Sequence, residues 1–81
     1  MDVKGILVKI DDIGDDYSMP KRVKATLIQI KTDLTEEGRD LDVVVTQAIY
    51  TLDEITNDVN ISMHAKTVIW DIISDLEALK K

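Results

Sequence analysis

The residues of this sequence that could do chemistry are concentrated in a group of acids followed closely by a group of bases. Aspartates occupy positions 11, 12, 15 and 16, and Lys21, Arg22 and Lys24 follow them. Clustered carboxylates could bind a divalent cation, but the ligand order and the distal glutamate of an EF-hand loop are missing. We therefore expect no metal site. We interpret the acids and bases as neutralising one another across a turn, with exposed pairs worth about 0–1 kcal/mol each.

Catalytic side chains do not form a recognisable set. His64 is the only histidine, and the chain has no cysteine, which excludes disulfides, thiolate metal sites and thiol catalysis. One histidine alone makes neither a catalytic triad nor a zinc site. The serine and threonine hydroxyls occur without a glycine-framed nucleophile turn, a phosphate loop or a dinucleotide fingerprint. We predict that the protein is not an enzyme, and we expect no cofactor and no small-molecule ligand.

Nucleic acid is a further class of partner that the charge pattern disfavours. The net charge of −6 repels phosphate backbones, and no aromatic residues are interleaved with the bases to stack on nucleotides. We expect no nucleic-acid partner. The alternative function that stays open is a nucleic-acid-associated accessory protein that uses Lys21, Arg22 and Lys24 at the start of a helix.

The elements that carry these residues are predicted to be helices, because apolar residues recur at helical spacing in four stretches. The first stretch fades near Gly14, and Pro20 fits the first turn of the second helix. Thr35 to Asp40 is the only linker-like segment, and Asn57 to Asn60 favours a turn, with Asn60 or Ser62 as the helix N-cap. The four apolar stripes are Val3, Ile6, Leu7, Ile10 and Ile13; Val23, Leu27, Ile30 and Leu34; Leu41, Val44, Val45, Ala48, Ile49, Leu52 and Ile55; and Ala65, Val68, Ile69, Ile72, Ile73 and Leu76.

The sequence matches itself when it is shifted by 42 positions without a gap. Positions 10–13 fall on 52–55 and positions 30–34 on 72–76, and seven pairs are identical over positions 10–34. We interpret this as an internal duplication, with repeat 1 at about residues 3–36 and repeat 2 at about 41–79. The acids at positions 53, 54 and 58 then repeat the first acidic helix end by common ancestry, without any site.

Two helical hairpins in 81 residues predict a single all-α domain over residues 1–81, because so short a chain has room for one core. Short connections favour antiparallel packing, so we expect a four-helix up-and-down bundle. A two-repeat solenoid of HEAT type is the alternative, since 42 residues lies within its usual repeat length. Charges near the N-terminus and the lack of a run of about 18–20 apolar residues lead us to expect a soluble, cytoplasmic protein with no membrane partner.

The segment from Asn57 to Trp70, with Asp53-Glu54-Ile55 before it, resembles the signature stretch of the archaeal uncharacterised protein family 0147. The resemblance runs nearly the whole chain and includes Met19-Pro20 and the basic residues after it. The sequence departs from the family pattern at Val59 and Ser62, where proline is common, and at Lys66, where arginine is common. The resemblance implies a small archaeal protein with a four-helix, bromodomain-like arrangement, and it implies no activity, cofactor or catalytic residue.

Some apolar residues lie off the predicted core stripes, and the repeat relates four of them in pairs. Position 8 maps onto 50 and position 28 onto 70. A broad bundle core could absorb Trp70, and isolated exposed apolar residues are ordinary. The alternative is an interaction surface centred on Tyr50, Val43 and Val8, because contiguous apolar surface usually marks an interface. The off-stripe residues are Val8, Ile28, Val43, Tyr50 and Trp70.

The biochemical function is not specified by any of these features. We predict a non-catalytic structural or protein–protein interaction module that forms a homo-oligomer or binds a protein partner. A core this small gives an independent reason for association, because a chain below about 70–80 residues seldom gains more than 3–5 kcal/mol from one core.

Overall fold

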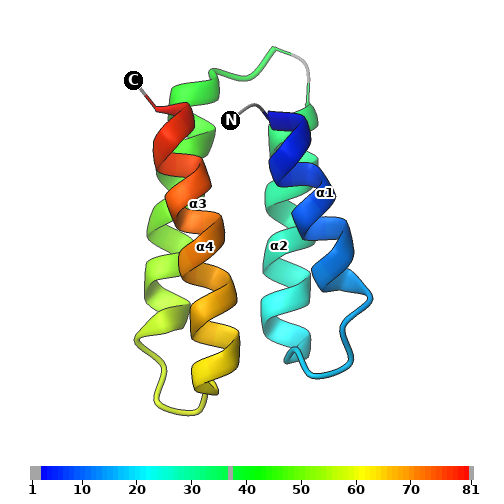
Figure 1. The fold of residues 1–81 in the computed structure, drawn as a ribbon. Coiled ribbons are helices and arrows are strands. Elements are labelled where there is room, and N and C mark those ends of the chain that lie inside the picture. The colour runs from blue at the N-terminus through cyan, green and yellow to red at the C-terminus, as the bar shows by residue number, and fades with distance from the viewer. Residues whose placement is uncertain (1–2, 37, 81) are drawn as a thin grey trace.

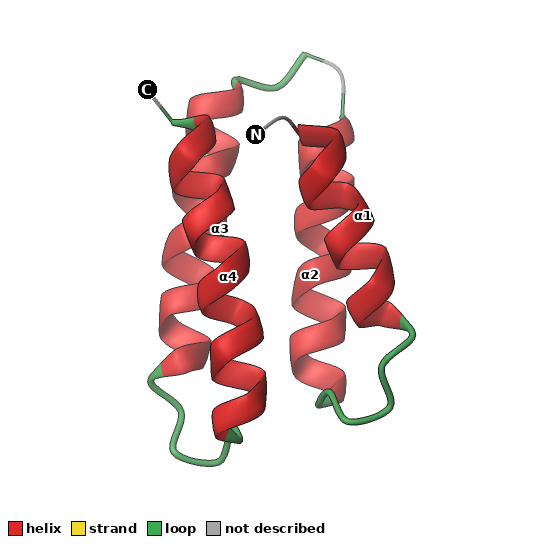
Figure 2. Ribbon diagram, in the orientation of Figure 1, coloured by secondary structure: helices red, strands yellow, loops and turns green. Residues whose placement is uncertain are grey.

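The computed structural model describes residues 3–36 and 38–80 and contains four antiparallel helices in this part of the chain (Figure 1). They are α1 (Val3–Gly14), α2 (Lys21–Thr35), α3 (Leu41–Thr56) and α4 (Met63–Leu79). Loops join them, and the described residues include no strand (Figure 2). The α1–α2 and α3–α4 loops lie at one end of the bundle, and the α2–α3 connection lies at the other. The predicted all-α four-helix bundle is therefore confirmed.

The order of packing around the bundle excludes the solenoid alternative. α1 packs against α2 and α4, and α3 packs against α2 and α4, so the four helices close into a ring. In an array of HEAT type the first helices of successive repeats stack together, which would place α1 on α3 and α2 on α4. Here those pairs lie diagonally, and the HEAT-type prediction is wrong.

The core is aliphatic, as the periodicity predicts, and it extends into the hairpin loops. Met19 and Ile61 come from the two loops and are 5% and 8% exposed. They were not predicted to be buried, because each lies in a turn outside the helical periodicity. Leu41 was placed in the core by its spacing, but its side chain is 41% exposed at the first position of α3.

Helix starts are set by short polar side chains at two of the described helices. The Ser62 hydroxyl accepts a hydrogen bond from the Ala65 N–H, which confirms Ser62 rather than Asn60 as the cap of α4. Asp40 caps α3 by accepting from the Asp42 N–H. Pro20 precedes α2 at the cap position instead of lying inside its first turn. Gly38 has φ of 83° in the connection between the hairpins, a left-handed conformation that favours glycine.

The two hairpins have the same construction at a spacing of 42 residues. Gly14 ends α1 and Thr56 ends α3, while Lys21 begins α2 and Met63 begins α4. In the loops, the side chain of Asp16 accepts from the Ser18 N–H at 2.8 Å, and Asp58 accepts from the Asn60 N–H at 2.9 Å. Equal turns at equal spacing are what a duplication predicts. Descent from one ancestral hairpin stays a prediction.

Candidate functional site

The predicted neutralisation across the first turn is not found among the described residues, because none of the three bases at positions 21, 22 and 24 forms an ion pair with the aspartates at positions 11, 12, 15 and 16. Lys31 pairs with Asp11 between α2 and α1. Arg22 instead pairs with Asp58 in the other hairpin at 2.8 Å, because the two loops lie at the same end of the bundle. Lys24 lies over the Tyr17 ring, 5.6 Å from its centroid. Two of the three bases behind the nucleic-acid alternative are thus engaged with protein groups.

His64 makes the contact that is equivalent to the pair between Arg22 and Asp58. Its Nε2 atom lies 3.7 Å from a carboxylate oxygen of Asp16, and its side chain is 61% exposed. The pKa of Asp16 lies below its ordinary value, chiefly because the Ser18 hydroxyl and backbone N–H donate to the carboxylate, with a smaller contribution from His64. Asp16 and Asp58, at equivalent loop positions, therefore each contact a basic side chain from the other hairpin.

The acids and hydroxyls of the described residues are engaged mostly in local hydrogen bonds and ion pairs. Within residues 3–36 and 38–80, no three histidine or acidic side chains are placed to hold a metal ion. Several threonine hydroxyls are already used by their own helices: those of Thr26, Thr51 and Thr67 donate to the backbone carbonyl four residues earlier. In this part of the molecule, no buried side-chain nitrogen or oxygen lacks a hydrogen-bond partner.

Lys9 joins α1 to α4 by bonds to two carboxylates. Its ammonium lies 2.6 Å from Asp75, whose side chain is 11% exposed, and 3.0 Å from the more exposed Asp71. Hydrogen bonds to Asp75 and then to Asp71 raise the pKa of Lys9 above its ordinary value. This contact was not predicted, because the packing of α1 beside α4 was not known from the sequence.

The residues of the predicted interaction surface are exposed, but they do not form one surface. Val43 and Tyr50 lie two turns apart on α3, whereas Val8 lies on α1, the helix diagonally opposite. Ile28 lies on α2 and Trp70 on α4. The exposed fractions are 53% for Val8, 56% for Ile28, 52% for Val43, 67% for Tyr50 and 48% for Trp70.

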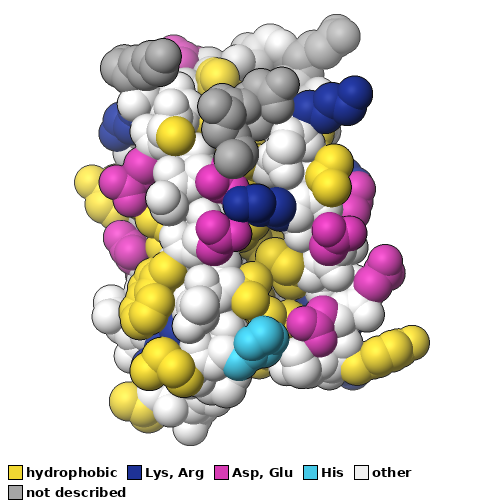
Figure 3. Space-filling model, viewed as in Figure 1, with side chains coloured by type: hydrophobic (Ala, Val, Ile, Leu, Met, Phe, Trp, Pro, Cys, Tyr) yellow, Lys and Arg dark blue, Asp and Glu magenta, His cyan; other side chains and the backbone are white. Residues whose placement is uncertain are grey.

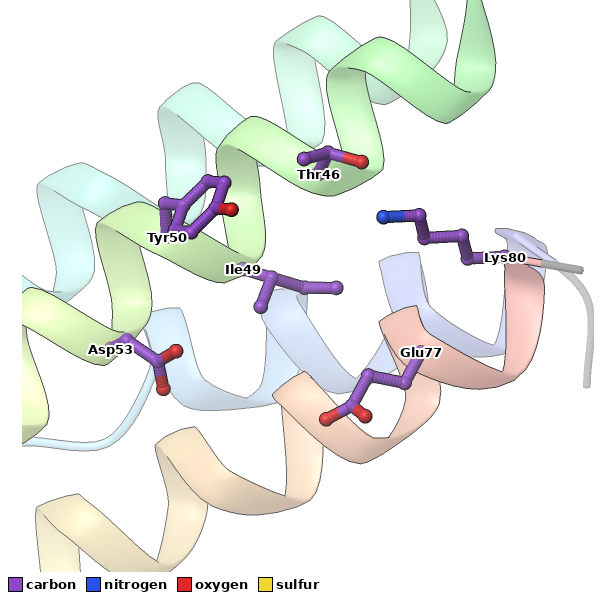
Figure 4. A pocket seen from close by; sticks show the side chains of 6 residues that line it. All are labelled: Thr46, Ile49, Tyr50, Asp53, Glu77 and Lys80. Atoms are coloured by element: carbon purple, nitrogen blue, oxygen red, sulfur yellow. The ribbon is translucent and has the colours of Figure 1, made fainter.

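The aromatic members of this set flank a shallow groove between α3 and α4. The groove has a volume of about 430 Å³ and is lined by Thr46, Ile49, Tyr50, Asp53, Glu77 and Lys80. In Figure 4 Tyr50 and Asp53 come from α3, Glu77 and Lys80 come from the end of α4, and Ile49 lies between the helices. Trp70 precedes Glu77 by two turns on the same side of α4, and Met63 precedes Trp70 by two more.

We call this side of the bundle the α3–α4 face and define it by the exposed apolar residues Val43, Tyr50, Met63 and Trp70 with the groove between them. In Figure 3 hydrophobic side chains follow the left edge of the molecule, where α3 and α4 lie. Met63 is 67% exposed and was not among the predicted surface residues. Its spacing of seven residues from Trp70 was the signal that could have identified it.

Comparison with known proteins places the chain in a family. The model of the uncharacterised protein family UPF0147 matches residues 2–79. The chain belongs to UPF0147. A UPF0147 protein of Methanocaldococcus jannaschii is 37% identical over 78 residues, which are 96% of this chain and 84% of the relative. One from Thermoplasma volcanium is 36% identical over 76 residues, or 94% of this chain and 85% of the relative.

Solved structures agree with the UPF0147 assignment. A crystal structure of a UPF0147 protein from Thermoplasma acidophilum superposes with a TM-score of 0.88 at 32% identity, covering 95% of this chain and 91% of that one. A crystal structure of a protein of unknown function superposes with a TM-score of 0.82 at 35% identity, covering 96% and 89% of the two chains. The resemblance of the segment from Asn57 to Trp70 to this family is confirmed, and the family name specifies no biochemical function. None of the described helices is both long and apolar enough to cross a membrane.

Proposed function

We propose that this UPF0147 protein is a non-catalytic protein-interaction module whose α3–α4 face binds a second copy of the chain. The observation that carries the proposal is the exposure of Val43, Tyr50, Met63 and Trp70 on one side of the bundle. Aromatic residues and methionine are enriched in the buried centres of interfaces. Removing such side chains from water contributes about 25 cal/mol per Å² of apolar surface, so dimerisation would stabilise a small domain.

The charges on the α3–α4 face suit a second copy of the same chain. Asp53 and Glu77 supply two carboxylates, and Lys66 and Lys80 supply two ammonium groups. None of these four side chains forms an ion pair within the described part of one chain. Asp42 adds a third carboxylate beside the first apolar residue of the face. The face is therefore closer to neutral than the whole molecule, whose net charge is −6, and two copies can pair opposite charges there.

The dimensions of the bundle are also compatible with this mode of association. Its principal extents are 34 × 23 × 19 Å. One long side is therefore comparable with the area of about 800 Å² that each partner contributes to an interface of standard size. A twofold contact uses the same surface on both copies and closes on itself, so it gives a dimer rather than a fibre.

The non-catalytic part of the proposal is supported by how the reactive groups are used. The imidazole of His64 is exposed, and it contacts the Asp16 carboxylate rather than a hydroxyl. The Thr51 and Thr67 hydroxyls donate to their own helices. A nucleophile needs a base within hydrogen-bond reach. The Ser18 hydroxyl does donate to the Asp16 carboxylate at 2.6 Å, but this contact is exposed in the α1–α2 loop, and neither residue lines the groove between α3 and α4 or the groove between α1 and α4.

The test compares a double variant of the α3–α4 face with a double variant of the opposite side of the bundle. Val43→Ser/Tyr50→Ala alters the α3–α4 face, and Val8→Ser/Ile28→Ser alters the opposite α1–α2 side, where positions 8 and 28 correspond to 50 and 70. Light scattering at high micromolar concentration should give twice the chain mass of 9.1 kDa for the wild type and for Val8→Ser/Ile28→Ser. Val43→Ser/Tyr50→Ala should give a folded monomer.

Fluorescence supplies a second readout, because Trp70 is the only tryptophan. Its emission should shift to shorter wavelength as the wild type is concentrated, since burial at the interface removes the indole from water. A wild type that stays monomeric would overturn the proposal. So would a dimer that dissociates in Val8→Ser/Ile28→Ser and persists in Val43→Ser/Tyr50→Ala.

A further inference from the structure

We infer that the groove between α1 and α4 is a second, independent docking site, and that it takes a basic amphipathic helix of a partner protein. The groove has a volume of about 480 Å³ and is lined by Lys9, Asp12, Ile13, Thr67, Val68, Asp71 and Ile72. Figure 3 shows hydrophobic side chains exposed along the seam between α4 and α1, with acidic and basic side chains beside it. This site lies on a different side of the bundle from the α3–α4 face and does not depend on dimerisation.

The floor of the groove is apolar and remains partly open. Ile13 and Val68 are only partly buried, although both pack against the core, and Ile72 lies beneath them fully buried. The lining residues of α4 extend from Thr67 to Ile72, about 8 Å along the helix. This length accommodates two aliphatic side chains one helical turn apart, which is how an amphipathic helix anchors in a hydrophobic groove.

The charged side chains at the rim of the groove predict that the partner is basic. Asp12 from α1 and Asp71 and Asp75 from α4 supply three carboxylates, and Lys9 supplies one ammonium that already bonds to the last two. Asp12 forms no ion pair within the described residues. The excess of carboxylate is complementary to lysine or arginine on the partner.

The equivalent groove on the other side of the bundle is chemically different, which makes it an internal control. The groove between α2 and α3 has a volume of about 340 Å³, and five of its lining residues are equivalent by the 42-residue spacing to lining residues of the α1–α4 groove. Thr26 stands there for Val68, Gln29 for Asp71 and Thr51 for Lys9. The architecture is similar, but the α2–α3 groove has uncharged polar side chains at the positions of Val68, Asp71 and Lys9.

The closing experiment uses a synthetic amphipathic peptide of about 15 residues, long enough to form a helix. The peptide carries leucines on one face and lysines on the other, and a leucine/glutamate peptide of the same pattern is its control. Titration of the full chain, followed by NMR, should move the resonances of Ile13, Val68 and Ile72. The leucine/glutamate peptide should leave them in place.

Three variants separate binding in the groove from general attraction to an acidic protein. Asp12→Lys should weaken binding by about tenfold or more, because it replaces an attractive contact with a repulsive one. Glu54→Lys makes the same change of net charge at the equivalent, exposed position in the last turn of α3. It should leave the dissociation constant for the peptide within about twofold of the wild-type value. Lysine at the C-terminal end of a helix is favourable, so both variants should fold. Val68→Thr, which installs the residue found at position 26, should also weaken binding.

The results that would overturn the inference are specific. Equal weakening by Asp12→Lys and Glu54→Lys would show attraction by net charge only. Resonance changes centred on Gln29 and Gln47, or on Tyr50 and Trp70, would place the peptide elsewhere. Binding should persist in Val43→Ser/Tyr50→Ala, so loss of the dimer and loss of the docking site are distinguishable.

Discussion

At the scale of single residues, Asp75 is the one ionisable side chain that is buried among the described residues. Its carboxylate faces the seam between α4 and α1 and accepts a hydrogen bond from the Lys9 ammonium at 2.6 Å. A buried acceptor that loses its partner costs more than an exposed one, because water cannot replace the lost bond. The ion pair between Lys9 and Asp75 should therefore contribute more to the stability of this domain than the ion pairs at its surface.

We predict that Lys9→Met lowers the free energy of unfolding by more than the loss of an exposed ion pair does, since it leaves the Asp75 carboxylate unpaired. Lys31→Met is the control: its partner Asp11 is 59% exposed, so the loss should be about 0–1 kcal/mol. Urea denaturation followed by circular dichroism measures both. Equal losses for the two variants would contradict the argument from burial.

The same pair gives a pH dependence with a defined sign. The pKa of Lys9 is raised in the folded state, so its contribution is complete below the unfolded pKa, near 10.5, and is lost as the pH rises through the higher folded value. The difference in stability between wild type and Lys9→Met should therefore be constant through neutral pH and shrink only above pH 10.5. A difference that shrank between pH 6 and 9 would point to another group.

At the scale of the elements, the two hairpins start their second helices differently although the preceding turns are alike. Ser62 caps α4 with its side chain, whereas Pro20 occupies the equivalent position before α2 without a side-chain hydrogen bond. Proline already has the backbone angle that a helix start needs and lacks one of the unpaired N–H groups. The start of α4 is therefore stabilised by a side-chain hydrogen bond, whereas the start of α2 is favoured by the fixed backbone angle of proline.

We predict that Ser62→Ala lowers the free energy of unfolding by about 1 kcal/mol, because the Ala65 N–H loses its acceptor. Ser74→Ala is the matched control at an exposed position inside α4, where alanine is the better helix former and the change should be neutral or slightly stabilising. Thermal unfolding compares them. A loss in both variants would mean that the hydroxyl at position 62 acts in some way other than as a cap.

At the scale of the whole molecule, the hairpin loops close one end of the core. Met19 and Ile61 come from equivalent loop positions and are both part of the buried cluster. They lie in turns, yet their side chains pack among residues of the helices. The core of this small domain thus depends on its loops as well as on its helical stripes.

We predict that Met19→Ala and Ile61→Ala each lower the free energy of unfolding by about 2–4 kcal/mol, through lost apolar burial and the cavity left behind. Val59→Ala provides the comparison in the same kind of loop, because Val59 is 90% exposed and should tolerate the change. Chemical denaturation gives the three values. Much smaller decreases in the free energy of unfolding at positions 19 and 61 would show that the loop end of the core repacks around the shortened side chain and leaves no cavity.

The sequence was sufficient for the helices and the hairpin pairing, but not for the caps of α2 and α3. The stripe from Val3 to Ile13 and the stop near Gly14 agree with α1, and Ser62 is one of the two caps that were considered. These features depend on neighbours within one or two helical turns, so they can be read from local spacing. The periodicity wrongly predicted that Leu41 is buried, because the first position of α3 lies beyond the end of the core.

Only the tertiary structure decided which helices are neighbours, and the surfaces follow from that. The periodic stripes fit a bundle and a solenoid equally well, because both bury one face of each helix. Contact of α1 with α4 joins Lys9 to Asp75 and forms the acidic-rimmed groove, and the diagonal position of α1 and α3 separates Val8 from Tyr50. Residues up to 66 positions apart in the chain meet there, and no local spacing encodes such a contact.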